Sequence, residues 1–86
     1  MKYEIEISET ALKELAKLDK PTLKKFDKAV IKLRNDPFQS KTEKLVNHPQ
    51  ASYRHRIGNW RILFDILPNQ IIRIIHIWSR GKDYKK

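Results

Sequence analysis

The sequence contains no cysteine, only two glycines and one methionine among its 86 residues. Without cysteine, disulfides and thiolate metal sites are excluded, so the core must be held by packing alone. Long hydrophobic runs are also missing, because Arg61, Asp65 and Arg73 interrupt the apolar stretches well before the roughly 20 residues that a bilayer requires. Glutamates directly behind the N-terminal methionine exclude a secretory signal. We therefore expect one small cytoplasmic domain over 1–86 without a membrane segment, ending in a mobile polar tail at 81–86.

Acidic side chains are scarce in the C-terminal part of the chain. The whole sequence carries 19 Lys and Arg against 10 Asp and Glu, a net charge of +9. Residues 51–86 hold 8 basic side chains against Asp65 and Asp83, which gives +6 for this shorter part. Arg34 is the only arginine among the first 50 residues, whereas the rest of the chain has five. Because the planar guanidinium fork matches phosphate, this distribution predicts a polyanionic partner.

The N-terminal half predicts a strand followed by two helices. Residues 2–7 alternate between apolar and charged side chains, as a half-buried strand does. Ser8 then occupies a helix N-cap position, and apolar residues at helical spacing continue to Leu18. Pro21 suits the first turn of a second helix, which carries an apolar stripe until the break at 35–37. Two helices joined by a tight turn are expected to form a hairpin that covers a sheet.

The C-terminal half predicts that sheet. After a short candidate strand at 44–46, three stronger strand patterns follow at 52–57, 60–67 and 71–78. Gly58-Asn59 and Pro68-Asn69 separate them as hairpin turns, so the strands should run antiparallel. The expected fold is α+β, in the order β-α-α-β-β-β(-β), with an antiparallel sheet covered on one face by the N-terminal helical hairpin.

Strand alternation assigns three arginines to one face of this sheet. Arg54 and Arg56 share a face of the first hairpin strand, and Arg61 lies opposite the apolar residues of the next strand that must receive the helices. The turn brings the two strands within cross-strand reach. We expect the three side chains to converge on the face away from the helices, with Asp65 as the opposing charge. The alternative is an ordinary solvated sheet face, which is how we interpret the helix lysines.

The histidines and the last tyrosine allow fewer conclusions. His48, His55 and His76 have no metal-site spacing, so we predict no metal and no cofactor. Alternation places His55 on the apolar side, whereas His76, near the end of the sheet, is a candidate for a functional role. Tyr84 stands in a polar tail near arginines, where its ring could stack on a base.

The segments 53–64 and 71–84, with their basic-x-basic strand, Gly58, Trp60-Arg61 and the Arg80 and Tyr84 pair, resemble the RelE/ParE superfamily of toxins from prokaryotic toxin–antitoxin modules. The resemblance covers nearly the whole chain. It implies an endoribonuclease that cuts messenger RNA on the ribosome, by attack of a ribose 2′-OH on the adjacent phosphate without a metal. It also implies a cognate antitoxin as partner.

Under this resemblance, the catalytic positions are Arg54, Arg56, Arg61, Arg80 and Tyr84. Arg61 and Arg80 would clamp or protonate the phosphate, and Tyr84 would stack on a base or align the nucleophile. We expect three further basic residues to extend the RNA-binding surface: Lys44, Arg73 and Lys82.

The sequence departs from the family pattern at the positions expected to move protons. Many relatives have lysine where Arg54 and Arg56 stand, and arginine cannot lose its proton. Many also have histidine where Ser79 stands. The general base is therefore unassigned, which keeps two alternatives open: a ParE-like inhibitor of DNA gyrase that acts by protein contacts without nuclease activity, and an accessory RNA-binding domain.

Overall fold

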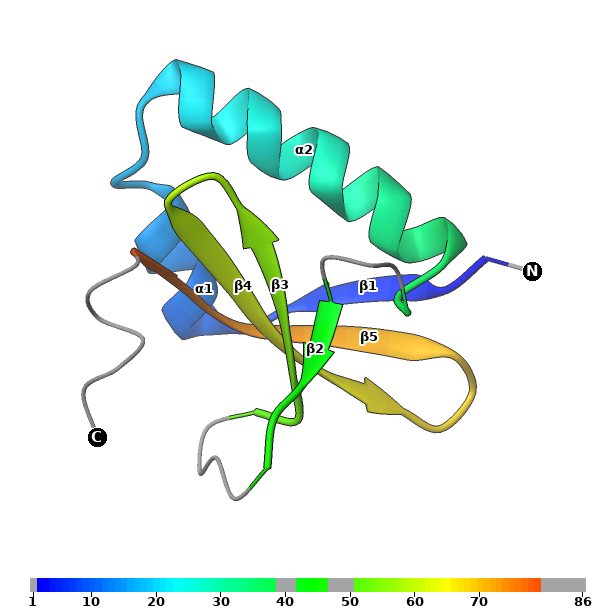
Figure 1. The fold of residues 1–86 in the computed structure, drawn as a ribbon. Coiled ribbons are helices and arrows are strands. Elements are labelled where there is room, and N and C mark those ends of the chain that lie inside the picture. Colours follow the sequence, from blue (N-terminus) through cyan, green and yellow to red (C-terminus); the bar gives the residue numbers. More distant parts are fainter. Residues whose placement is uncertain (1, 39–41, 47–50, 80–86) are drawn as a thin grey trace.

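The computed structural model describes residues 2–38, 42–46 and 51–79, which form two helices and five strands (Figure 1). Arg80, Lys82, Tyr84 and the predicted mobile tail lie outside these residues. The elements follow in the order β1 (Glu4–Ile7), α1 (Glu9–Leu15), α2 (Lys20–Asn35), β2 (Thr42–Lys44), β3 (Tyr53–Ile57), β4 (Trp60–Leu67) and β5 (Ile71–Ser79). None of the helices in the described part is long and apolar enough to cross a membrane.

The five strands form one sheet in the order β1-β5-β4-β3-β2. Strands β2 to β5 pair antiparallel, as the hairpin turns predicted. The first strand is the exception, because β1 lies parallel to β5, with Glu4 opposite Ile71 and Ile7 opposite Ile74. Between β1 and β5 the chain forms both helices and three strands, so no tight turn joins these two strands and they can pair in parallel. The α+β architecture is as predicted, and the sheet is mixed.

The two helices begin where the sequence indicates. The Ser8 hydroxyl accepts the Ala11 N–H at 3.0 Å as the N-cap of α1, and the Asp19 carboxylate accepts the Thr22 N–H at 3.0 Å as the N-cap of α2. Pro21 lies in the first turn of α2. Helix α1 packs mainly against β5, and α2 lies across the sheet over β1 and β3 (Figure 1). Helix α1 ends at Leu15, one turn before the predicted Leu18.

The core fills the space between the helices and one face of the sheet. It combines helix residues with alternating strand residues, and its buried members are Ala11, Leu18, Phe26, Ala29, Leu33, Ile62, Phe64, Ile72, Ile74 and Ile77. Tyr53 of β3 stacks on Phe64 of β4, with ring centroids 5.5 Å apart. The face of the sheet that packs against the helices is therefore mainly apolar, with His55 of β3 as a buried polar residue on it, and the alternate strand residues point to the opposite face.

A β-bulge in β5 changes which side chains reach this opposite face. Leu63 pairs with His76 and Phe64 pairs with Ile74, so Ile75 has no partner in the register with β4. Plain alternation along β5 would place Ile74 and Ile77 on different faces. The extra residue places both in the core, at 0% and 2% exposure. His76 and Trp78 consequently join Arg73 on the face away from the core.

Candidate functional site

The β3–β4 hairpin brings the predicted arginines together. Arg56 and Arg61 are direct cross-strand partners, two residues from the Gly58-Asn59 turn, and Arg54 pairs with Leu63 on the same face. Gly58 has φ +57°, a conformation that residues with a Cβ adopt only at a cost. We call the surface formed by Arg54, Arg56 and Arg61 the arginine face. Its position away from the helices is as the sequence predicted.

The three guanidinium groups differ in how far they are removed from water. Arg56 is exposed, the Arg54 side chain is 20% exposed, and Arg61 is buried at 5%. Leu63 lies between Arg54 and Arg61 on this face and is completely buried, although it does not belong to the core cluster. A charged side chain that lies against a buried apolar residue and is partly removed from water interacts more strongly with an anion than a charge in open water does.

An acidic residue that the sequence analysis did not consider also belongs to this surface. Glu43 of β2 pairs with Arg54 of β3, and its carboxylate accepts a hydrogen bond from the Arg54 guanidinium in an ion pair. This hydrogen bond, together with the nearby charges of Arg54, Arg56 and Arg61, holds the pKa of Glu43 below its usual value. The predicted opposing charge, Asp65, is occupied elsewhere, because its Oδ1 accepts the Ser52 N–H at 2.7 Å.

These pairings form one continuous row across four strands. Glu43 of β2 is opposite Arg54 of β3, Arg54 is opposite Leu63 of β4, and Leu63 is opposite His76 of β5. The neighbouring row consists of Arg56, Arg61 and Trp78. The arginine face therefore lies between a carboxylate on one side and an imidazole on the other.

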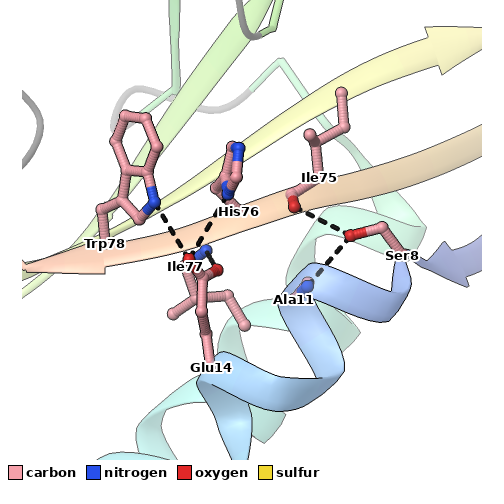
Figure 2. Close-up of polar contacts among 7 residues, drawn as sticks. All are labelled: Ser8, Ala11, Glu14, Ile75, His76, Ile77 and Trp78. Atoms are coloured by element: carbon pink, nitrogen blue, oxygen red, sulfur yellow. Dashed lines mark hydrogen bonds and ion pairs between the residues drawn. The ribbon is translucent and has the colours of Figure 1, made fainter. Parts of the chain in front are cut away.

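A second acidic residue that the sequence analysis missed is Glu14 of α1, which contacts His76 at the β5 end of this row (Figure 2). Its Oε1 accepts the Ile77 N–H at 2.7 Å, and its Oε2 accepts the Trp78 indole N–H at 3.0 Å. His76 Nδ1 lies 3.4 Å from the same Oε2, and the His76 and Trp78 rings have centroids 4.4 Å apart. No local pattern marks Glu14, because 62 residues separate it from His76.

Glu14 has this role because β1 covers only the first half of β5. Among the described residues, no strand lies beside the β5 edge after Ile74, and side chains form hydrogen bonds with its backbone groups instead (Figure 2). The Ser8 hydroxyl donates to the Ile75 carbonyl at 2.8 Å, and Glu14 accepts the Ile77 N–H. Helix α1 thus protects an exposed strand edge and at the same time places a carboxylate beside His76.

The remaining predicted residues are placed differently. Arg73 is exposed on the same sheet face as Arg61 but at the opposite end of the strands, opposite Asp65 and Glu6. Lys44 pairs with Tyr53, so the alternation puts it on the core side at the sheet edge, and the structure does not bring it to the arginine face. His55 is 3% exposed on the core side, with Nδ1 2.9 Å from the Thr42 hydroxyl, as expected for a buried boundary histidine.

Known proteins are similar to this chain in sequence and in fold. Residues 5–84 match the family described as ParE toxin of type II toxin–antitoxin system, parDE. This chain belongs to the RelE/ParE superfamily of toxins. The toxin is 33% identical over 82 residues to RelE1 of Methanocaldococcus jannaschii, which is named as a candidate toxin; the match covers 93% of this chain and 91% of the relative.

Solved structures share the toxin's fold. The RelE–RelB complex from Pyrococcus horikoshii matches with a TM-score of 0.80 at 24% identity, over 95% of this chain and 99% of that one. The toxin–antitoxin complex RelBE2 from Mycobacterium tuberculosis matches with a TM-score of 0.82 at 21% identity, over 93% and 100%. The predicted superfamily and the α+β fold are both confirmed, and these structural neighbours are complexes of a toxin with its antitoxin.

Proposed function

We propose that this toxin is an endoribonuclease that cuts messenger RNA, on the ribosome and in the cytoplasm, by attack of a ribose 2′-OH on the adjacent phosphate. The observation that carries the proposal is the direct pairing of Arg56 with Arg61, with Arg54 on the same face. Like charges at paired positions repel each other and weaken a hairpin, and a bound phosphate would offset this repulsion by attracting both guanidinium groups. The relative named RelE1 supports the same branch of the superfamily.

The arginine face supplies the charge that such a reaction needs. As the 2′-oxygen attacks, negative charge accumulates on the oxygens around phosphorus, and guanidinium groups held in place stabilise it without reorganising. Arg61 is suited to this role because it is 5% exposed and its strand is central in the sheet. Arg56 is exposed, so it can meet the RNA backbone first and share the same phosphate.

Glu43 is the proton acceptor in this proposal, the role that the sequence analysis left unassigned. Its carboxylate is ionised at neutral pH and can take the 2′-OH proton, while the ion pair with Arg54, which lowers its pKa, weakens it as a base in the absence of substrate. Arg54 holds the Glu43 carboxylate beside the other arginines. When a phosphate arrives, Arg54 can share its donors between the two anions, which would strengthen Glu43 as a base just where the substrate lies.

Five further roles from the sequence analysis remain predictions. Arg80 as a phosphate ligand, Tyr84 as a stacking partner and Lys82 as an RNA contact lie outside the described residues. Arg73 is exposed and can contact the RNA backbone beyond the cut site. Lys44 can do so only from the sheet edge, because it does not share the arginine face.

Cleavage of defined RNA tests the proposal. Purified toxin should cut messenger RNA on programmed ribosomes at discrete sites, leaving a 2′,3′-cyclic phosphate and a 5′-hydroxyl, and a deoxyribose at the cut site should abolish the cut. Arg61→Ala should reduce the rate by about 10²–10³-fold. Lys28→Ala on α2 removes the same charge far from the site and serves as the control. Intact RNA with stoichiometric toxin, both on ribosomes and free, would contradict the proposal.

A second candidate function, inhibition of DNA gyrase by protein contacts, is favoured by the description of the matching family as ParE toxin. The arginines at 54 and 56 in place of lysine fit a protein without nuclease chemistry. A supercoiling assay separates the two functions. Gyrase inhibition that survives Arg61→Ala combined with Tyr84→Phe would support the ParE-like function and count against RNA cleavage.

The proposed protein partner is an acidic antitoxin segment. A chain with a charge of +9 repels itself, and an acidic segment over the arginine face would neutralise it. Val46, two residues beyond the end of β2, is 80% exposed and offers an apolar contact to such a segment. Binding to the folded state alone stabilises it, so the complex should melt well above the free toxin. Equal melting temperatures with and without the antitoxin would argue against this partner.

A further inference from the structure

His76 occupies a position on the opposite side of the arginine face from Glu43. The row Glu43, Arg54, Leu63, His76 crosses four adjacent strands, and three strand spacings of about 4.8 Å separate its ends by ~14 Å across the sheet. Both end residues lie on the same face of the sheet. Arg61, in the neighbouring row, lies on β4, one of the two strands between them.

This arrangement matches the demand of an in-line displacement. The attacking and leaving oxygens must lie on opposite sides of phosphorus, so the group that takes a proton and the group that gives one must also flank the phosphate. A phosphate held by Arg61 and Arg56 would have Glu43 on its β2 side and His76 on its β5 side. The carboxylate is assigned above to the attacking 2′-oxygen, which leaves the imidazole facing the 5′-oxygen.

The imidazole is also held in the right orientation for donating a proton. A carboxylate oxygen can only accept, so the Nδ1 that faces Glu14 Oε2 at 3.4 Å must carry a hydrogen. Figure 2 shows the other ring nitrogen, Nε2, on the side of the ring away from Glu14. The Trp78 ring packs against the imidazole, and its indole N–H donates to the same carboxylate oxygen. Glu14 and Trp78 therefore fix the orientation of the ring.

We propose that His76 is the general acid of the reaction and that Glu14 is its positioning residue. This inference rests on the proposed endoribonuclease function. Glu43 takes the proton of the 2′-OH, the 2′-oxygen forms a bond to phosphorus, and the bond from phosphorus to the 5′-oxygen breaks. The Nε2 proton of the His76 imidazolium passes to that 5′-oxygen, which leaves as a hydroxyl. The products are a 2′,3′-cyclic phosphate, a 5′-hydroxyl and a neutral His76.

Two RNA substrates distinguish proton donation from a structural role. They are identical except at the cut site, where one has the normal 5′-oxygen and the other a 5′-sulfur, which leaves as a thiolate without needing a proton. With the full-length toxin in single turnover, His76→Gln should lose about 10²–10³-fold on the oxygen substrate and stay within a few-fold of wild type on the sulfur substrate. Glu43→Gln should lose activity on both substrates, because the attacking group is unchanged.

The outcomes separate this inference from the function on which it rests. Cleavage of neither substrate by wild-type toxin would overturn the proposed function and this inference with it. Cleavage by wild type together with equal losses of His76→Gln on both substrates, or no loss on the oxygen substrate, would overturn the role of His76 alone.

Glu14→Gln provides a second variant that should keep the fold. The amide oxygen can still accept the Ile77 N–H, but the amide NH2 group cannot accept the Trp78 indole N–H, so the melting temperature should fall by less than in Glu14→Ala. An amide holds the imidazole less firmly than a carboxylate does, so the rate should fall on the oxygen substrate and stay within a few-fold of wild type on the sulfur substrate. Glu9→Gln, which changes an exposed carboxylate in the first turn of the same helix, is the matched control. An unchanged rate on the oxygen substrate, or equal losses on both substrates, would overturn the positioning role.

Discussion

Arg56 and Arg61 lie directly opposite each other on the two strands of the β3–β4 hairpin. Two positive charges at paired positions repel, and the hairpin retains them although neutral side chains would pair better there. Arg61 is also buried at 5%, where desolvation adds to the cost. We expect a pair of this kind to make the sheet less stable than it could be, and under the proposed function a bound phosphate would offset the repulsion.

Removal of the exposed charge should therefore stabilise the free toxin. Arg56→Gln is expected to raise the free energy of unfolding by a few tenths of a kcal/mol at low salt, and RNA affinity should fall at the same time. The gain should shrink as salt screens the repulsion. Urea denaturation at low and high salt measures it, with Lys28→Gln on α2 as a control for loss of one charge. Equal stability changes in the two variants would show that the pair carries no special repulsion.

The contact of Glu14 with the β5 edge should be important for stability. Glu14→Ala leaves the Ile77 N–H and the Trp78 indole N–H without their acceptor, and loss of a buried acceptor costs about 1–3 kcal/mol. Urea denaturation followed by tryptophan fluorescence should show this loss. Glu9→Ala on the same helix should change stability by less than about 0.5 kcal/mol. A Glu14→Ala variant as stable as Glu9→Ala would mean that water replaces the carboxylate at no cost.

The ion pair of Glu43 with Arg54 should make stability depend on pH. The pKa of Glu43 is lowered in the folded state, chiefly by the hydrogen bond from Arg54, relative to the usual 4.5. A lowered pKa contributes stability that is present above 4.5 and is lost as pH falls through the folded-state value. The Glu43 side chain is 49% exposed, so solvent screening limits the contribution to about 1 kcal/mol or less.

Comparison of wild type with Glu43→Gln by urea denaturation at neutral and at acidic pH measures this contribution. The difference between the two proteins should be largest at neutral pH and should vanish once Glu43 is protonated in both states. A difference that persists unchanged in acid would show that the carboxylate charge is not its source.

The turn that aligns Arg56 with Arg61 depends on Gly58. Its φ of +57° disfavours any side chain, although a Cβ there would meet no atom within 4 Å. Gly58→Ala should therefore cost about 1 kcal/mol from backbone strain alone. Gly58→Asn should cost less, because asparagine tolerates the left-handed region better. Thermal denaturation of both variants tests this order, and an alanine variant at least as stable as the asparagine variant would contradict it.

Much of the arginine face could be predicted because it depends on local rules. Alternation assigns Arg54 and Arg56 to one face, and a two-residue turn at Gly58-Asn59 determines which residue of the next strand lies opposite. The helix starts were predictable for the same reason, since Ser8 and Asp19 cap helices that begin directly behind them. Where two contacting residues lie within one hairpin or one helical turn, their separation in the sequence determines their distance in the structure.

By itself, then, the sequence determined the α+β class, the hairpins and the convergence of three arginines, because periodicity and turn residues act over a few positions. Only the tertiary structure decided that β1 lies parallel to β5, that a bulge at Ile75 turns His76 toward the arginine face, and that Glu43 and Glu14 lie at the two ends of one row. These contacts join elements that are distant in sequence, and they depend on how helices and sheet pack together. In the proposed mechanism the Glu43 carboxylate and the His76 imidazole move the protons and Glu14 positions the imidazole, so packing rather than pattern placed these candidate groups beside the arginines.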